Sequence, residues 1–393
     1  MGNYRYLIVG AGMAASAAIE GIRSRDAQGS IALLGEEPFP PYNRPPLTKG
    51  LWKGDSEDTI WRALPEGVER RFGRRAVTVY PAERTVIDDR GERYGFEKLL
   101  FATGARPRRF PFDSDAIYFR TLEDSRRLHQ LAAVEGARFC VIGGGFIGSE
   151  IAAALAMNGH AVTMLVPEAG IGARIYPEDL STYLGRYYQR FGVEVLTNGR
   201  VTRIDRAESG ASVVRLADGK ALSFDTVVAG IGVEPEVTLA RDAGLAVDDG
   251  ILVDEFGGAG ASGAMFAAGD VARFPSAALG KTMRVEHEDH ALSHGRAVGA
   301  NMAGAAAPYR QLPFFYSDLF DLGYEAVGIL DARSTIVADW TEPFRKGVVY
   351  YLEAQRVRGV LLWGIFGKVD EARALIESTA LFGAPDLIGR IRP

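Results

Sequence analysis

Two glycine-rich segments of the chain have the residue types and the spacing that bind a pyrophosphate. Their small residues are Gly10, Gly12 and Ala15 in the first segment and Gly143, Gly145 and Gly148 in the second. In a strand-turn-helix unit the first glycine forms the turn and the second lets backbone N–H groups approach a phosphate, while the last small residue lets the helix pack closely. The pattern therefore predicts two dinucleotide-binding sites.

An acidic residue follows each segment at about 20 residues, the distance at which a carboxylate binds the ribose of a dinucleotide. These residues are Glu36 and Glu168. The alternative is two ordinary strand-turn-helix units with acids in these places by chance. A carboxylate at Glu168 repels the 2′-phosphate of NADP and so favours NAD, although Arg174 keeps NADP open.

The elements around the two segments indicate an α/β fold. Apolar runs predict strands at 4–9, 31–34, 139–142 and 161–166, with helices after the two glycine-rich turns, the second of them at 151–157. The two copies lie about one domain length apart. We therefore expect two Rossmann-like modules instead of a short tandem repeat.

The last part of the chain has a different pattern. It predicts strands at 326–329, 335–338, 348–352 and 357–365 and a helix at 369–381. This indicates a separate α+β domain from about residue 309. Between the two modules, residues 36–51 are rich in proline, which predicts an ordered, extended loop rather than a helix.

Composition excludes several classes of protein. The chain has 393 residues and a net charge of −5, so nothing attracts it as a whole to nucleic acid or to anionic lipid. Its one cysteine, Cys140, excludes a disulfide framework, a thiolate zinc site and an iron–sulfur cluster bound by the chain's own cysteines. No apolar run reaches the ~18 residues of a membrane span, and no leader is recognisable. We expect a cytoplasmic protein.

The order of motifs resembles that of the flavoprotein reductases with two dinucleotide-binding domains. The motifs are GAGMAA, ATGARPR, GGGFIGSE, VVAGIGVEP and AAGD. The resemblance implies a glutathione-reductase-like fold with FAD in the first module and NAD(H) in the second. The FAD-binding domain would comprise residues 1–115 and 241–308, the NAD(H)-binding domain 116–240 and the C-terminal α+β domain 309–393.

Shorter motifs narrow the resemblance to two subfamilies. The loop PYNRPPLTK at 41–49 is similar to that of ferredoxin reductases of oxygenase systems and of apoptosis-inducing factor, while VEHEDHA at 285–291 and FYSDL at 315–319 are nearer to apoptosis-inducing factor. The long acidic insertion of that factor is missing, since only residues 340–346 occupy its place.

The resemblance also implies roles for individual residues. For FAD, it implies contacts from the first fingerprint and from Glu36, Arg44, Lys49, Thr103, Gly104, Gly269, Asp270, Glu286, His287 and Tyr316. For NAD(H), it implies contacts from the second fingerprint and from Phe146, Glu150, Glu168 and Gly232. Thr103 and Gly104 are explained nearly as well by a turn, and Phe146 by an ordinary core position.

Three of these residues would act in the reaction itself. Lys49 and Glu150 match positions that pair beside the flavin, and His287 matches one near the nicotinamide. The alternative for Lys49 and Glu150 is a solvated surface charge. Arg44 would bind the FAD pyrophosphate and Asp270 the ribitol chain, whereas an exposed arginine and an N-cap aspartate are their ordinary alternatives.

Two further patterns remain open. His287, His290 and His294 have the spacing of one helix face and could bind a metal, but the ordinary explanation is an amphipathic polar face, and we predict no metal site. Arginine runs at 70–75 and 106–109 could dock an acidic ferredoxin or could simply be solvated.

From the sequence we predict an FAD-dependent NADH oxidoreductase, monomeric or homodimeric, that passes electrons to a ferredoxin-type protein and binds neither nucleic acid nor membrane. One alternative is an NADH-responsive redox sensor like apoptosis-inducing factor; another is a reductase of quinone or oxygen. A disulfide reductase is excluded, because Cys140 has no partner cysteine.

Overall fold

The computed structural model describes residues 2–392 and divides the chain into two compact units. Unit 1 comprises residues 1–44, 56–106 and 234–313, and unit 2 comprises residues 45–55, 107–233 and 314–393. The strands β7 (Ala105–Pro107) and β16 (Val233–Pro235) contain two of the points where the chain passes from one unit to the other. The three-domain division, with boundaries near 115, 240 and 308, stays a prediction.

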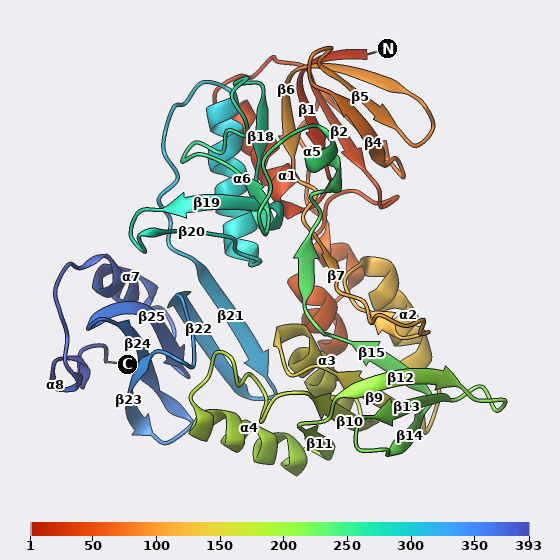
Figure 1. Cartoon of the computed structure of the whole chain (residues 1–393), viewed down its shortest axis with the longest axis vertical. Coiled ribbons are helices and arrows are strands. Elements are labelled where there is room, and N and C mark those ends of the chain that lie inside the picture. Colours follow the sequence, from red (N-terminus) through yellow and green to blue (C-terminus); the bar gives the residue numbers. More distant parts are fainter. Residues whose placement is uncertain (1, 393) are drawn as a thin grey trace. The chain divides into compact units, whose positions relative to one another are not determined.

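Unit 1 is built on a mixed sheet with the strand order β3-β2-β1-β6-β5-β4, and β18 pairs with β6 (Figure 1). Its strands are β1 (Gly2–Val9), β2 (Ile31–Gly35), β3 (Val68–Phe72), β4 (Ala76–Tyr80), β5 (Thr85–Asp88), β6 (Arg93–Phe101) and β18 (Met265–Ala267). The pairs β1–β2, β1–β6, β2–β3 and β6–β18 are parallel. Buried strands of this kind read as apolar runs, which is why β1 and β2 were predictable.

Two helices of unit 1 lie side by side, α1 (Met13–Arg23) and α6 (Glu288–Met302), as Figure 1 shows. A Cβ atom added to Gly295 would lie 2.3 Å from the Ala14 carbonyl oxygen, and one added to Gly299 would lie 2.0 Å from that of Ala18. Glycine in α6 therefore allows the two backbones to touch. The rest of unit 1 consists of η3 (Glu57–Ile60), α5 (Thr238–Asp242), η4 (Gly269–Val271), β17 (Ile251–Leu252), β19 (Ala272–Ser276) and β20 (Lys281–Met283).

Unit 2 contains the second Rossmann-like module, a parallel sheet with the order β11-β10-β9-β15-β8. Its strands are β8 (Ile117–Tyr118), β9 (Arg138–Ile142), β10 (Ala161–Val166), β11 (Val193–Thr197) and β15 (Thr226–Ala229). The helices are α2 (Leu122–Ala132), α3 (Phe146–Met157) and α4 (Glu178–Arg190), and β12 (Val201–Arg206), β13 (Ser212–Leu216) and β14 (Ala221–Phe224) form a separate antiparallel sheet.

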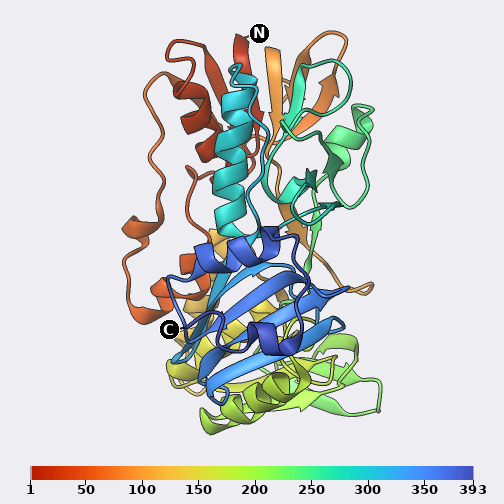
Figure 2. The same ribbon diagram turned by 90° about the vertical axis from the view of Figure 1, so that its left-hand side faces the viewer.

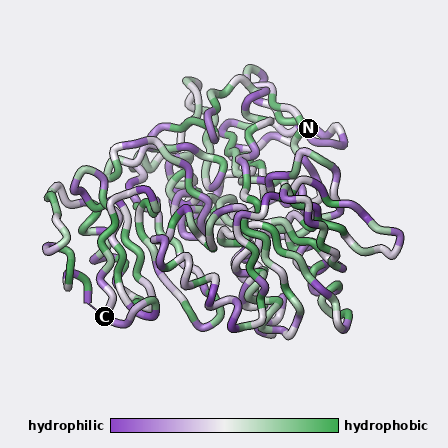
Figure 3. The backbone as a smooth tube through the Cα atoms, turned by 60° about the horizontal axis from the view of Figure 1, so that its bottom comes forward, coloured by the Kyte–Doolittle hydropathy of each residue, from purple (hydrophilic) through white to green (hydrophobic). Residues whose placement is uncertain are grey.

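The C-terminal part of unit 2 is an antiparallel sheet with the order β21-β22-β25-β24-β23, covered by α7 (Val369–Glu377) (Figure 2). Its strands are β21 (Phe314–Leu319), β22 (Leu322–Gly328), β23 (Thr335–Glu342), β24 (Lys346–Glu353) and β25 (Arg356–Trp363), followed by α8 (Ala384–Leu387). The predicted α+β pattern is confirmed. Figure 3 shows hydrophobic stretches along strands of this sheet, in agreement with the burial of most residues of β24 and β25.

The proline-rich segment differs from the prediction of an extended loop. It contains two short 3₁₀ helices, η1 (Pro45–Thr48) and η2 (Gly50–Lys53). Proline is tolerated at the start of a helix, because its fixed φ suits the first turn and its missing N–H would have no intrahelical partner there. In residues 2–392 no helix has the length and apolar character needed to cross a bilayer.

Candidate functional site

The two glycine-rich turns have the same geometry in their separate units. Gly10 and Gly143 have φ values of 101° and 113°, and their N–H groups donate to Leu34 O and Leu165 O, both at 2.8 Å. A Cβ atom at Gly10 would lie 2.2 Å from the Ala102 carbonyl oxygen, just after β6, and one at Gly143 would lie 2.3 Å from that of Gly230, just after β15. Both the positive φ and this close approach require glycine.

The second glycine of each turn leaves an open space at a helix N-terminus. Gly12 is the N-cap of α1 and Gly145 the N-cap of α3, and neither makes a side-chain cap hydrogen bond. A Cβ atom at either position would meet nothing within 4 Å. Since the first N–H groups of a helix have no intrahelical acceptor, these two spaces fit the pyrophosphates of FAD and of NAD(H).

The last small residue of each segment lies in a packed position. Ala15 is fully buried in α1, and a Cβ atom at Gly148 would lie 2.1 Å from the Gly143 carbonyl oxygen. Both therefore serve close packing of the helix against the turn.

The two predicted ribose-binding acids each follow a strand of their module. Glu36 is exposed at the end of β2, and Glu168 follows β10 and forms an ion pair of 2.6 Å with Arg174. The Glu168 side chain is 27% exposed and that of Arg174 is 84% exposed. Arg174 therefore already has a carboxylate partner, which reduces its availability for a 2′-phosphate.

The remaining FAD candidates of unit 1 lie at strand ends and in loops. Thr103 follows β6 and donates to Glu236 O at 2.7 Å, and Gly104 has a φ of 68°. Gly269 has a φ of 76° and begins η4, which also contains Asp270. Arg44 forms an ion pair with Glu37 at 2.9 Å. Their roles toward FAD stay predictions.

His287 and Glu286 precede α6. His287 is the N-cap residue of that helix, and Glu286 is exposed and forms an ion pair with Arg284. Burial lowers the pKa of His287 to about 4, and the charge of Asp270 opposes this shift. At neutral pH the imidazole is therefore uncharged, and it can donate one hydrogen bond and accept another.

In unit 2, the structure brings Lys49 and Glu150 together as an ion pair, with side chains that are 13% and 6% exposed. Thr48 Oγ1 donates to Glu150 Oε2 at 2.6 Å, and Ser317 Oγ donates to Glu150 Oε1 at 2.5 Å. Glu150 thus joins the proline-rich segment, α3 and β21. Its three donors satisfy the buried carboxylate of Glu150. The carboxylate in turn keeps the positive charge of Lys49 at a defined place.

Two aromatic candidates lie near this pair within unit 2. Tyr316 is 40% exposed, and Lys49 Nζ lies 5.8 Å from the centroid of its ring. Phe146 begins α3 and packs edge-on against Phe315, with 5.4 Å between the ring centroids. Phe146 is only half-buried, so it is not an ordinary core phenylalanine.

Gly232 lies just beyond β15, has a φ of 96°, and its carbonyl accepts from the Arg108 N–H at 2.9 Å. Like the other site residues, it was singled out from its motif. Its proposed contact to NAD(H) stays a prediction.

Several residues that support the site were not singled out from the sequence. Thr48 and Ser317 bind Glu150, and the Trp52 ring stacks on His129 at a centroid distance of 3.8 Å, which anchors the segment that carries Lys49. Ser317 could have been found, because strand alternation places it on the inner side of β21, opposite Tyr316. Nothing in the sequence pointed to the Trp52–His129 pair.

The interpretation of the three histidines as a polar face is wrong. His287 precedes the helix, while His290 and His294 are 1% and 0% exposed and lie against the ring of Phe274. Amphipathic spacing does not distinguish a polar surface from a buried aromatic cluster when the polar residue is histidine. In the described part of the chain, no group of three or more potential ligands is arranged to bind a metal.

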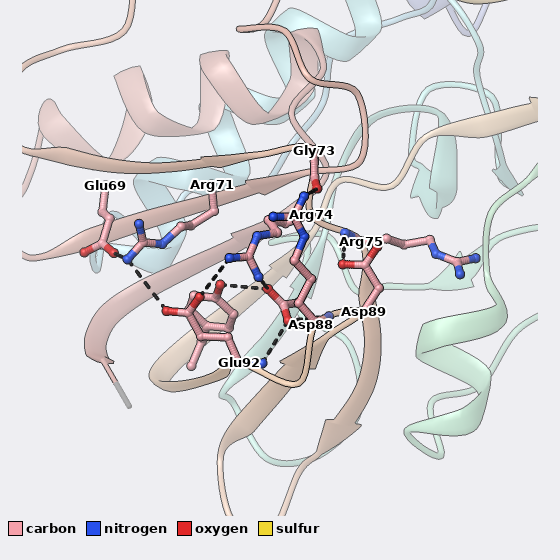
Figure 4. Close-up of polar contacts among 10 residues, drawn as sticks. Glu69, Arg71, Gly73, Arg74, Arg75, Asp88, Asp89 and Glu92 are labelled. Carbon is pink, nitrogen blue, oxygen red and sulfur yellow. Dashed lines mark hydrogen bonds and ion pairs between the residues drawn. The ribbon is translucent and has the colours of Figure 1, made fainter.

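The arginine runs are largely paired within unit 1 or bound to backbone. Figure 4 shows Arg71 in contact with Glu69 and Arg74 in contact with the buried Asp88, and Glu92 also lies within ion-pair distance of both arginines. In the second run, Arg106 pairs with Glu234 and Glu236, and the Arg108 guanidinium donates to a backbone carbonyl. Arg70, Arg75 and Arg109 are nevertheless exposed, so docking of a partner by either run stays a prediction.

Comparison with known proteins agrees with these features. A family model for pyridine nucleotide-disulphide oxidoreductases matches residues 4–295, and one for the C-terminal region of mitochondrion-associated apoptosis-inducing factor matches residues 298–343 and 334–378. The chain is 32% identical over 418 residues to mitochondrial apoptosis-inducing factor 1 of Dictyostelium discoideum, with 95% of this chain and 78% of the relative covered.

A second relative is the ferredoxin–NAD(+) reductase component of the anthranilate 1,2-dioxygenase system of Burkholderia cepacia, 37% identical over 344 residues, with 84% of each chain covered. Among solved structures, a covalent complex of putidaredoxin reductase with putidaredoxin contains a chain that matches with a TM-score of 0.89 and 27% identity, covering 96% of this chain and 94% of the other. The predicted resemblance, fold class and cofactors are confirmed. The chain therefore belongs to the pyridine nucleotide-disulphide oxidoreductase family, as an FAD-dependent NAD(P)H oxidoreductase with two dinucleotide-binding domains and a C-terminal domain like that of apoptosis-inducing factor.

Proposed function

We propose that this protein is an NADH-dependent reductase that passes electrons from its flavin to a small ferredoxin-type iron–sulfur protein. The observation that carries the proposal is the state of its one cysteine. Cys140 is fully buried in β9, and burial raises the pKa of its thiol. With no reactive cysteine pair, electrons must leave for an acceptor outside the chain. The ferredoxin reductases among the relatives support a ferredoxin as this acceptor.

Bound FAD supplies the acceptor for a hydride from reduced nicotinamide and can release its electrons one at a time. The chain's own residues bind and orient. In this proposal the open helix N-termini at Gly12 and Gly145 hold the two pyrophosphates, and Lys49 provides a fixed positive charge whose position Glu150 determines. His287 provides an uncharged imidazole at the start of α6.

We propose NADH over NADPH because of Glu168. As the ligand of the ribose, its carboxylate would repel a 2′-phosphate, and the Arg174 guanidinium is already paired with it at 2.6 Å. We expect Glu168→Ala to weaken NADH binding strongly and to leave bound FAD undisturbed. Loss of FAD with unchanged NADH affinity would show that the two modules are assigned in reverse.

The decisive test of the module assignment uses alanine at the two open glycines. A methyl group at Gly12 or Gly145 fits the fold but occupies the space assigned to a phosphate. We expect Gly12→Ala to lower FAD content, and Gly145→Ala to retain FAD while the Kd for NADH rises at least about tenfold. Gly185→Ala is the matched control, because that glycine lies inside α4 with nothing within 4 Å of its added Cβ. It should affect neither cofactor.

The acceptor is tested by anaerobic reduction with NADH followed by a panel of oxidants. Rapid electron transfer to a ferredoxin, faster than to quinones or oxygen, is the result expected. A second candidate function is an NADH-responsive sensor, which the match of residues 298–378 to the C-terminal region of apoptosis-inducing factor favours. Slow reoxidation together with a change in oligomer size on addition of NADH would support the sensor and contradict the reductase.

A cytoplasmic location and a monomeric or homodimeric state remain predictions. Size-exclusion chromatography with light scattering, with and without NADH, measures the oligomeric state.

A further inference from the structure

A chain of buried hydroxyl groups runs from Glu150 into the C-terminal sheet. Ser317 Oγ donates to Glu150 Oε1 at 2.5 Å, and the Tyr176 hydroxyl donates to the Tyr324 hydroxyl at 2.9 Å. Ser317 and Tyr324 are directly opposite each other on the antiparallel strands β21 and β22. The side chains are nearly inaccessible, with exposures of 1% for Ser317 and Tyr324 and 3% for Tyr176.

The direction of the hydrogen bonds along this chain follows from the number of protons available. Each hydroxyl has one proton to donate. Tyr176 gives its proton to Tyr324 and Ser317 gives its own to Glu150, so neither of these hydroxyls has a second proton to donate. Both bonds therefore run in the direction of the carboxylate, and the Tyr324 hydroxyl accepts on the side of Tyr176.

The two tyrosines stay protonated at every working pH. Burial raises the pKa of Tyr176 and of Tyr324 well above the usual value for tyrosine, and the nearby charge of Glu150 raises both further. They consequently act as donors and never as competing anions. Their rings are held in place by Trp363, which lies 5.4 Å from the Tyr324 ring and 5.7 Å from the Tyr176 ring, centroid to centroid.

The far end of the chain lies in the loop that carries Glu168 and Arg174. This loop is bound to the C-terminal part of unit 2 at three consecutive residues. Arg174 O accepts from Ala332 N at 3.0 Å, Ile175 O accepts from the Tyr351 hydroxyl at 2.7 Å, and Tyr176 begins the hydroxyl chain. The C-terminal sheet thus holds the loop assigned to the NADH ribose and the carboxylate that binds Lys49.

We propose that Ser317 is a positioning residue for the Lys49–Glu150 pair, and that Tyr324, which faces Ser317 across the strand pair, and Tyr176, which donates to Tyr324, hold Ser317 in place from behind. This inference rests on the proposed function only in assigning the pair to the flavin. The hydroxyls act through Glu150 and not on a cofactor. Losing Ser317 Oγ leaves the carboxylate with one donor fewer, and losing the Tyr324 hydroxyl lets Ser317 and then Lys49 move.

The test uses Ser317→Ala, Ser317→Thr and Tyr324→Phe in the full-length protein. Tyr324→Phe removes one oxygen atom and retains the ring stacked on Trp363. Tyr350→Phe is the matched control, because Tyr350 is a fully buried tyrosine of the same sheet whose hydroxyl accepts from Ile391 N and is not part of the chain. Thr at 317 restores the hydroxyl.

The first readout needs no turnover. The purified proteins are treated briefly with an amine-acetylating reagent, and modification of Lys49 is followed by mass spectrometry, with the exposed Lys53 as internal reference. We expect Lys49 to react at least about fivefold faster in Ser317→Ala, because a hydrogen bond to the charged Glu150 carboxylate is lost. Tyr324→Phe should act in the same direction, because it removes the hydroxyl that lies behind Ser317. Ser317→Thr and Tyr350→Phe should react like the wild type.

The second readout is stopped-flow reduction of the flavin by NADH. We expect the limiting rate to fall by about tenfold in Ser317→Ala and Tyr324→Phe while the Kd for NADH changes less than about twofold. Wild-type labelling and wild-type rates in both variants would overturn the inference and leave the proposed function intact. If NADH does not reduce the wild-type flavin, the proposed function fails, and the labelling experiment alone decides the inference.

Discussion

At the scale of single residues, Glu150 has three side-chain partners in the candidate site. It is 6% exposed and accepts from Lys49, Thr48 and Ser317, which come from three separate segments of unit 2. Removing its charge leaves the ammonium group of Lys49 largely buried without a counter-ion. Such a change is more costly than deleting a whole buried ion pair.

We therefore predict that Glu150→Gln destabilises unit 2 by about 3 kcal/mol. Urea unfolding followed by circular dichroism measures this change. The matched control is Glu135→Gln at an exposed position, which should change the stability by less than about 0.5 kcal/mol. Equal stabilities for the two variants would mean that the pair contributes nothing to the fold.

The sequence contained part of this site. The motifs placed Lys49 and Glu150 in one cluster, because each stands in a recognisable segment. Ser317 is one residue beyond Tyr316, and strand alternation would have placed it on the buried face. Tyr176 could not be inferred, because its contact with Tyr324 depends on how a loop and a distant sheet pack together, and no local pattern encodes that.

At the scale of elements, Figure 4 shows how charged side chains join β3 and the loop after it to the end of β5 and the turn before β6 in unit 1. Asp88 has a fully buried side chain and accepts from Arg74 at 2.7 Å and from the Tyr94 hydroxyl at 3.0 Å. Burial alone would raise the pKa of Asp88, but backbone N–H groups of Glu92 and Arg90 and these two side chains lower it. The first arginine run is thus part of the fold.

We predict that Arg74→Gln lowers the stability of unit 1 by about 1–2 kcal/mol and leaves ferredoxin reduction unchanged. Thermal unfolding and the steady-state rate with ferredoxin are the two measurements. The control is Arg70→Gln. The Arg70 side chain is exposed, and its guanidinium makes a long contact of 3.4 Å with the Leu64 carbonyl oxygen. A lower rate with ferredoxin and an unchanged unfolding temperature would show instead that the run docks the partner.

Elements could be predicted where their pattern was local and regular. The predicted strand at 161–166 has the same bounds as β10, because it is a continuous apolar run in a parallel sheet. The helix predicted at 151–157 begins earlier, at Phe146, since the glycine-rich turn itself forms the N-cap. The 3₁₀ helices after Arg44 are not predicted, because a run of prolines indicates an extended loop unless a proline happens to start a helical turn.

At the scale of the whole molecule, we expect two buried histidines to lower the free energy of unfolding as the pH falls below about 6.5, before most carboxylates are protonated. His290 and His294 are buried, burial lowers the pKa of both, and that of His294 falls to about 3. The His294 Nδ1 atom accepts from the Gly269 N–H at 3.3 Å, which a protonated ring cannot do. Below about pH 6.5 the unfolded chain therefore binds protons at these two histidines that the folded chain does not bind.

We predict that His290 and His294 do not change the free energy of unfolding above about pH 6.5. As the pH falls below about 6.5, their contribution lowers it. The slope is at most about 1.4 kcal/mol per pH unit for each histidine. The double variant His290→Gln/His294→Gln should flatten the curve between pH 6.5 and about 4.5. His160→Gln, a change to a half-buried histidine in unit 2, should not. Identical slopes in the double variant and the wild type would contradict this account.

The interleaved path of the chain affects how the protein can fold during translation. Unit 2 contains residues 45–55, 107–233 and 314–393, so it is completed only after residues 314–393 have left the ribosome. Until then Glu150 lacks Ser317, and the nascent Rossmann-like module has no C-terminal sheet on which to dock its loop at 174–176. We expect premature stops near residue 313 to yield aggregating fragments rather than a smaller enzyme, and the cell to need chaperones on this stretch of synthesis.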